Sequence, residues 1–170
     1  LLARTRLDMQ QVFGSPAYAV LLFLGLANAL GGLWFATDET GYGGSIFPVT
    51  RVLIPTLAGT FGLIPIIISI YYAGELVWRE REKKTHEIVD STPAPDWAYI
   101  APKTLAISLV LLSTLAISVL AAVVIQASKG YFNFQIGEYL LWYVLPQSVD
   151  FILLAVLAVF FQVVSPHKFV

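Results

Sequence analysis

The sequence predicts an all-α, polytopic membrane protein, and three observations carry this prediction. Of the 170 residues, 58% are hydrophobic and only 12% are charged, whereas an average soluble domain is about 25% charged. The mean hydropathy is +0.77. Long charge-free stretches recur along the chain, and the basic residues gather on one side of the membrane that these stretches imply. A soluble enzyme and a disordered chain are therefore disfavoured.

The first element is a polar stretch at 1–14, which we expect to form a helix lying along the cytoplasmic interface. Ser15 and Pro16 then mark the start of the first span, because proline is favoured in the first turn of a helix. The chain begins with Leu1 and shows no cleavable signal peptide, so we expect it to be part of a longer protein.

The predicted spans follow from length and composition. A helix needs about 20 apolar residues to cross roughly 30 Å of hydrocarbon. The stretches 17–36, 52–73 and 104–127 meet this requirement without a charge, and the first holds Asn28 as its strongly polar residue. The stretch 151–164 reaches only about 21 Å. The fourth span is therefore predicted at 149–164, which brings Asp150 into it.

The orientation follows from the basic residues. With four crossings, Arg51 and Lys129 lie in the segments 37–50 and 128–148 or at their edges, and the other eight basic residues lie on the opposite side. We therefore expect both ends of the chain and the middle segment to be cytoplasmic. The aromatic part of 128–148 is expected to lie against the outer leaflet as an anchor, or to contact an apolar substrate.

The middle segment, 74–103, holds most of the charge. Between 75 and 103 lie 11 of the 21 charged residues. Glu75 and Arg79 form an i,i+4 pair with the acid first, which favours a helix over 75–90. Pro93 and its neighbours end that helix, and Pro102 opens the third span.

Two interpretations of this segment stay open. It is a solvated loop that sets orientation, or it is a helix to which a soluble partner binds. Both signs of charge are interspersed, which suits a protein partner better than anionic lipid, where lysine and arginine would dominate.

Several motifs in and beyond this segment resemble those of type 2 ABC transporter permeases. The cytoplasmic signature consists of a Glu-Arg pair, a threonine, an apolar pair, a proline and a lysine that opens the next span; here these are Glu80, Arg81, Thr85, Ile88, Val89, Pro93 and Lys103. The longer strings YYAGELVWRER at 71–81, TPAPDW at 92–97, YLLWYVLPQ at 139–147 and SPHK at 165–168 resemble a bacterial subgroup whose chains can carry a C-terminal zinc aminopeptidase domain.

The resemblance implies four helices of a larger, six-helix permease unit with a cytoplasmic coupling helix in the bacterial inner membrane. It also implies an ABC ATPase subunit as partner, together with a second permease half or a second copy of the chain. No G-x-x-x-x-G-K motif is present, so ATP would be bound by the partner and this segment would hold no cofactor. The residues expected to couple to the ATPase are Glu75, Arg79, Glu80, Arg81, Thr85, Ile88, Val89 and Pro93.

Three functions remain as alternatives. The first is the permease of an ATP-driven transporter, and the second is a membrane anchor for an appended zinc aminopeptidase. The third is a channel or ion-coupled carrier, which the absence of charge from the first three spans disfavours. No nucleic-acid partner is expected, because the pI of about 6.1 leaves no basic footprint. We expect no enzymatic activity in this segment.

Metal binding is not expected. The string from His86 to Asp90 begins like the zinc motif H-E-x-x-H but ends in aspartate, and that motif needs two histidines one turn apart. The chain holds only one further histidine, His167, and no cysteine.

Two residues within the spans are candidates for gating. Asp150 contributes to gating or substrate contact, or it sits at the lipid–water boundary, since a carboxylate inside a span is costly. Pro65 is expected to kink the second span, as a hinge or as a packing irregularity. The glycines Gly31, Gly32, Gly59 and Gly62 are expected to permit close helix packing.

Overall fold

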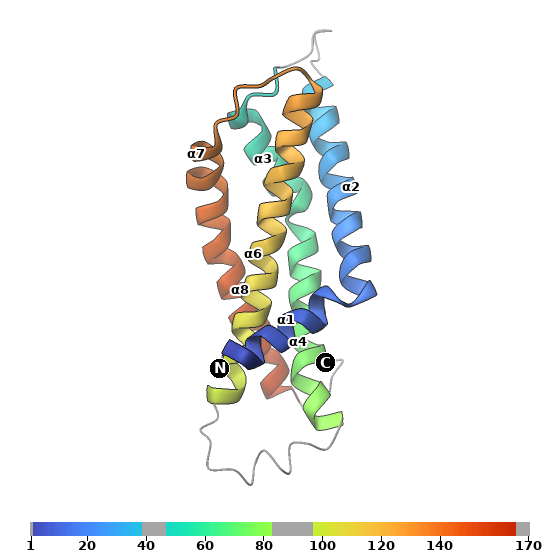
Figure 1. The fold of residues 1–170 in the computed structure, drawn as a ribbon, viewed down its shortest axis with the longest axis vertical. Coiled ribbons are helices and arrows are strands. Elements are labelled where there is room, and N and C mark those ends of the chain that lie inside the picture. The colour runs from blue at the N-terminus through green and yellow to red at the C-terminus, as the bar shows by residue number, and fades with distance from the viewer. Residues whose placement is uncertain (1, 39–46, 83–96, 166–170) are drawn as a thin grey trace.

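The computed structural model describes residues 2–38, 47–82 and 97–165. In these ranges the chain forms a bundle of long helices, with one short helix crossing its lower end (Figure 1). Four helices of the described ranges are long and apolar enough to cross a membrane. The prediction of an all-α, polytopic membrane protein is confirmed.

Helix α1 (Leu2–Phe13) lies across the bundle, and α2 (Pro16–Asp38) turns away from it to run along the bundle (Figure 1). The turn between them is closed by a hydrogen bond from the Gly14 N–H to the Gln10 carbonyl, at 2.9 Å. The rings of Phe13 and Tyr18 meet edge to face across this turn, with centroids 5.3 Å apart. This aromatic contact sets the angle at which the chain enters α2.

The second spanning helix is interrupted. It consists of α3 (Thr50–Phe61) and α4 (Leu63–Glu82), separated at Gly62. Pro65 follows three residues later and has no N–H to donate to the carbonyl of Phe61, so a regular helix cannot pass through this turn. The predicted irregularity is therefore present, one turn before the proline.

Helix α6 (Trp97–Ser128) is the central helix, and it contacts α1, α2, α3, α4 and α8. Half of its most apolar window is buried, against 17% for that of α2. It begins earlier than the predicted span at 104, so that Pro102 lies inside it. The helix tolerates this proline because only one backbone hydrogen bond is lost, near the end where partners are already missing.

Helix α6 ends in a Schellman motif. The Tyr131 N–H donates to the Gln126 carbonyl at 2.9 Å, and the Gly130 N–H donates to the Ala127 carbonyl at 3.0 Å. Gly130 has φ of +78°, a left-handed conformation in which a Cβ would be strained.

The last spanning helix is formed by α7 (Ile136–Tyr139), the π-helical turn η1 (Leu140–Val144) and α8 (Leu145–Val164). It begins 13 residues before the predicted start at 149, and part of the aromatic segment 128–148 belongs to it. Tyr139 and Tyr143 are buried in the bundle rather than lying along a surface. The π turn ends at Val144, two residues before Pro146, and widens the helix, which lets it continue past the proline.

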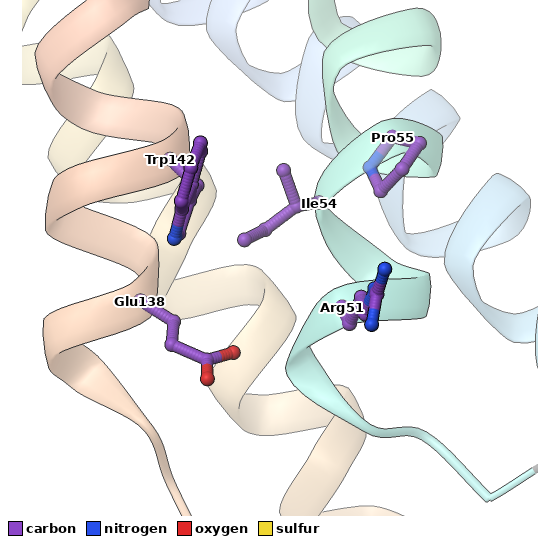
Figure 2. A pocket seen from close by; sticks show the side chains of 5 residues that line it. All are labelled: Arg51, Ile54, Pro55, Glu138 and Trp142. Carbon is purple, nitrogen blue, oxygen red and sulfur yellow. The ribbon is translucent and has the colours of Figure 1, made fainter.

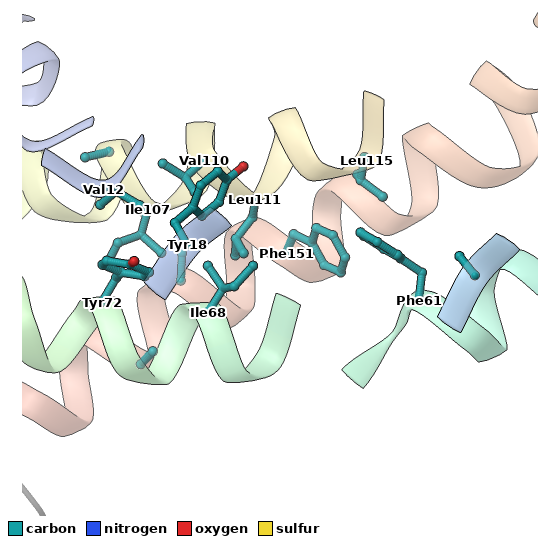
Figure 3. Packing of buried hydrophobic residues seen from close by; sticks show 14 of the residues in the cluster. Val12, Tyr18, Phe61, Ile68, Tyr72, Ile107, Val110, Leu111, Leu115 and Phe151 are labelled. Atoms are coloured by element: carbon teal, nitrogen blue, oxygen red, sulfur yellow. The ribbon is translucent and has the colours of Figure 1, made fainter. Parts of the chain in front are cut away.

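Figure 3 shows a part of the core, where buried hydrophobic side chains of several helices pack together. Buried side chains from α1, α2, α4, α6 and α8 meet in it, among them Val12, Tyr18, Ile68, Leu111 and Phe151. Short polar contacts cross it, such as the hydroxyls of Ser118 and Tyr143 at 3.0 Å. Large apolar side chains also cover much of the outer surface, as expected of helices surrounded by lipid.

Candidate coupling site at the lower end of the bundle

The predicted coupling residues begin on α4. Glu75 is half-buried, and Arg79 lies one turn further on with a quarter of its side chain exposed. The backbone of Glu80 and Arg81 continues the helix, but their side chains lie outside what the structure describes. Thr85, Ile88, Val89 and Pro93 also lie outside the described residues. The site that the structure describes is therefore the group of helix ends on either side of residues 83–96, namely the end of α4, the start of α6 and the helices packed against them. We call this group the frame.

Helix α1 crosses this end of the bundle and is fastened to α4 (Figure 1). Arg79 Nη2 donates to Asp8 Oδ1 at 2.8 Å, and only 2% of the Asp8 side chain is exposed. The other carboxylate oxygen, Oδ2, is buried without a partner among the described residues. Since a buried carboxylate is strongly destabilising without its cation, Arg79 holds α1 to the end of α4.

Helix α1 is also fastened to α6, the helix that resumes after residues 83–96. The Arg4 guanidinium lies over the Tyr99 ring, 4.9 Å from its centroid, in a cation–π contact. Further along α1, Val12 is buried in the core. One short helix therefore contacts both helices that flank the coupling segment.

Helix α8 joins the same frame through a side-chain hydrogen bond. The Trp78 indole N–H donates to Gln162 Oε1 at 3.1 Å. Gly74, one turn earlier on α4, faces the same glutamine: a Cβ built there would lie 3.5 Å from its side-chain atoms. A displacement of the end of α4 would thus be transmitted to α1 through Asp8 and to α8 through Gln162.

The lysine of the signature, Lys103, lies in the second turn of α6 and is buried. It does not reach out toward a soluble partner with its side chain. Its side chain is instead packed inside the bundle, at the start of α6.

The two gating candidates lie higher in the bundle. Pro65 is buried on α4, just after the interruption at Gly62. On α2, the Asn28 side-chain amide donates to the Thr60 carbonyl at 2.6 Å. A neighbouring helix therefore supplies a donor to the interrupted turn, as polar side chains do inside membranes.

Asp150 lies at the middle of the last spanning helix. It is fourteen residues from both ends of Ile136–Val164, or about 21 Å at 1.5 Å per residue. Its side chain is exposed on the outside of the bundle, and its carboxylate has no partner among the residues that the structure describes. The early helix start moves Asp150 away from the helix end, where the boundary interpretation had placed it.

The four predicted packing glycines differ in their surroundings. A Cβ on Gly62 would lie 2.9 Å from the Ala58 carbonyl oxygen of the preceding turn, so the close contact there is with the chain's own backbone. A Cβ on Gly32 would lie 2.3 Å from Thr60 Cγ2, so α2 and α3 approach closely there. A Cβ on Gly31 or Gly59 would meet nothing within 4 Å, and these two glycines therefore do not serve helix packing within the described ranges.

No group of three or more histidine, cysteine, aspartate or glutamate side chains is placed to hold a metal within the described ranges. The string from His86 to Asp90 lies outside them.

Sequence reasoning missed Asp8 and Gln162. Asp8 had one available signal, since it is the only acidic residue before Asp38. Its partner Arg79 is 71 residues away, however, and nothing local to either residue predicts the pairing.

Comparison with known proteins agrees with the architecture. A model of the family described as ABC-2 family transporter protein matches residues 6–165. Searches among curated proteins and among solved structures found no significant match. The family is a membrane component of transporters rather than a catalytic enzyme in itself, and it implies a lipid environment and an ABC ATPase partner. The match extends over nearly the whole described chain, and the protein therefore belongs to the ABC-2 family of transporter proteins.

Proposed function

We propose that the chain is the permease subunit of an ABC transporter and that the end of α4 carries the movement of a partner ATPase into the membrane. ATP binds to the partner, and this segment holds no cofactor of its own. The partner contacts residues near Glu75–Pro93, and the spans switch between inward- and outward-facing states. The substrate is left open.

One observation supports this proposal above the others. The helices before and after residues 83–96 are held by the same short helix, α1, through the Asp8–Arg79 ion pair and the Arg4–Tyr99 contact. Force applied to the intervening segment would therefore be shared by α1, α4 and α6 rather than bending one free helix end. Such a rigid frame suits a segment that receives mechanical work.

The test is a double substitution, Glu80→Ala with Arg81→Ala, in the full-length protein. Loss of both charges should weaken co-purification with the ATPase subunit and lower the ATP hydrolysis that the permease stimulates by about tenfold, the lower end of the range for charge-assisted contacts. Hydrolysis by the isolated ATPase subunit is the baseline of the measurement.

The matched control removes one acid and one base at the opposite end of the bundle. Asp38→Ala with Lys129→Ala deletes the ion pair between these two residues, with the same change of net charge. Stimulated hydrolysis should be unchanged in this control. Equal hydrolysis in the Glu80/Arg81 variant and the control would contradict the coupling role.

We also propose the arrangement around this core function. The protein lies in a bacterial inner membrane with α1 and both ends of the segment on the cytoplasmic side. It works with a second permease half or a second copy of itself. The position of the basic residues Arg4, Arg6 and Arg79 at the α1 end supports this orientation.

An anchor for an appended zinc aminopeptidase is the alternative that sequence resemblance raised. The family match describes a transporter and gives no support to that subgroup. Deletion of residues 75–90 would separate the two functions if the variant lost transport activity and kept peptidase activity. Peptidase activity in the absence of any ATPase partner would favour the anchor.

Asp150 favours a second candidate, an ion-coupled carrier or channel. A carboxylate inside a span is costly and marks an ion pathway when it faces the protein interior or water, so this candidate requires that the exposed side of Asp150 be covered in the assembled protein. In the permease, Asp150 and Pro65 instead act in gating or substrate contact. Asp150→Asn should lower ATP-dependent transport in a permease. Transport that follows an ion gradient without the ATPase, and that Asp150→Asn abolishes, would identify a carrier instead.

A further inference from the structure

A cavity of about 470 Å³ opens between α3 and the α7–η1 segment, at the end of the bundle opposite α1. Figure 2 shows the five side chains that line it, which come from both walls: Arg51, Ile54, Pro55, Glu138 and Trp142. None of these residues belongs to the proposed coupling site.

The lining is ordered by depth (Figure 2). Arg51 and Glu138 lie in the first turns of α3 and α7, on facing walls near the end of the bundle. Ile54 and Trp142 lie one turn deeper on the same two walls. A charged level thus overlies an apolar level, as polar head groups overlie hydrocarbon in a bilayer.

The polar groups of the cavity are available to a ligand. Neither the Arg51 guanidinium nor the Glu138 carboxylate forms an ion pair or hydrogen bond with the residues that the structure describes. The Trp142 indole N–H is likewise unpaired there, and its ring is two-thirds exposed. Trp142 also lies in the π-helical turn η1, a feature that is frequent at functional sites.

We propose that this cavity binds a zwitterionic phospholipid with an ethanolamine head group. Arg51 pairs with the phosphate, Glu138 pairs with the ammonium, and an acyl chain lies along Trp142 and Ile54. Phosphatidylglycerol offers Arg51 the same phosphate, but its head group ends in neutral hydroxyls and offers Glu138 no cation. The site therefore selects head groups that carry both charges. This inference does not depend on the substrate that the protein transports.

The experiment measures lipid binding to the purified full-length protein by native mass spectrometry, with phosphatidylethanolamine and phosphatidylglycerol of identical chains. The wild-type protein should prefer phosphatidylethanolamine. Arg51→Gln should weaken binding of both lipids by about fivefold, the size of one partly exposed charge-assisted hydrogen bond. Glu138→Gln should remove the preference between them, because only the ammonium uses that carboxylate.

Matched variants at the opposite end of the bundle control for charge and ring loss. Arg6→Gln and Trp97→Ala change exposed residues far from the cavity, and lipid binding should be unaffected by either. Trp142→Ala should weaken both lipids equally and keep the preference. The thermal stability of each variant is measured as well, and a variant that is less stable than the wild-type protein is treated as a folding defect.

Three results would overturn the proposal: no lipid preference in the wild-type protein, an Arg51→Gln variant that behaves like Arg6→Gln, or a preference that survives Glu138→Gln. Water-soluble glycerophosphoethanolamine tests the alternative source of the head group. Its competition at the same concentration as the intact lipid would show that the chains contribute nothing, and the lipid would then be the wrong ligand.

Discussion

At the scale of single residues, the ion pair between Asp8 and Arg79 is the main polar contact between α1 and α4 at the lower end of the bundle. The carboxylate is almost fully buried, whereas the guanidinium keeps a quarter of its side chain exposed. Removing the arginine therefore leaves a buried charge with no compensation, and removing the aspartate leaves a cation that still reaches water.

This asymmetry gives a prediction for the free energy of unfolding. Arg79→Ala should destabilise the protein by about 2–3 kcal/mol and Asp8→Ala by about 1–2 kcal/mol. The double variant should lose less than the sum of the two, because the remaining partner is no longer stranded. The free energy of unfolding is measured by thermal and denaturant unfolding in detergent for the wild-type protein, the two single variants and the double variant. Strictly additive losses would contradict the ion pair.

Asn28 illustrates what residue identity alone reveals. It is the strongly polar residue of the first span, and inside a membrane such a side chain needs a hydrogen-bond partner. The partner, the Thr60 carbonyl at 2.6 Å, depends on how α2 and α3 are rotated about their axes.

At the scale of elements, the contact between α2 and α3 depends on small residues. Gly25, Ala29 and Gly32 follow one another at helical spacing, and all three lie toward the bundle. Opposite Gly32, the Thr60 hydroxyl donates to the Thr56 carbonyl at 2.8 Å, which fixes the Thr60 side chain. Its methyl group therefore cannot turn away from a larger neighbour without breaking this hydrogen bond.

Adjacent glycines on α2 provide a matched test. Gly32→Ala should destabilise the protein by about 1–3 kcal/mol, because the new Cβ would overlap Thr60 and force the helices apart. Gly31→Ala should be neutral or stabilising by about 0.5–1 kcal/mol, since that Cβ enters open space and alanine favours helix. The measurement is thermal unfolding of both variants; equal losses would contradict the packing of α2 against α3.

The start of the last spanning helix could not be predicted from local sequence preferences alone. The short apolar stretch 151–164 indicated a helix start at 149, and the aromatic residues of 128–148 indicated an interfacial segment. The structure carries the helix through Pro146 by means of the π turn η1 and directs Tyr139 and Tyr143 into the core. Burial of these rings against neighbouring helices outweighs the local preference of the proline.

At the scale of the whole molecule, the two ends of the bundle have different character. Contacts between α1, α4, α6 and α8 tie the lower end together. At the upper end, Lys129 pairs with Asp38 and lies over the Trp34 ring, 4.0 Å from its centroid. The Gln126 amide also donates to the Pro48 carbonyl at 2.9 Å. These contacts hold α2, the start of α3 and the end of α6 together at the upper end of the bundle.

The absence of cysteine from the sequence makes the proposed orientation directly measurable. Gln10→Cys on α1 and Phe132→Cys at the other end introduce single exposed thiols. A membrane-impermeant maleimide added to intact spheroplasts should label the F132C variant, and it should label the Q10C variant only after permeabilisation. The reverse pattern would show the opposite orientation. Labelling of both variants from outside would contradict an odd number of membrane crossings between residues 10 and 132.

By itself, the sequence determined the all-α membrane architecture, because hydropathy and charge act along the chain and are legible in any window of about 20 residues. It also indicated the charged middle segment, the irregularity near Pro65 and the unusual Asp150. Only the tertiary structure decided that Arg79 meets Asp8, that Gly32 rather than Gly31 faces α3, and that Arg51 and Glu138 line the same cavity. Each of these depends on the rotation and depth of one helix relative to another, and those are set by the packing of the whole bundle rather than by any local pattern.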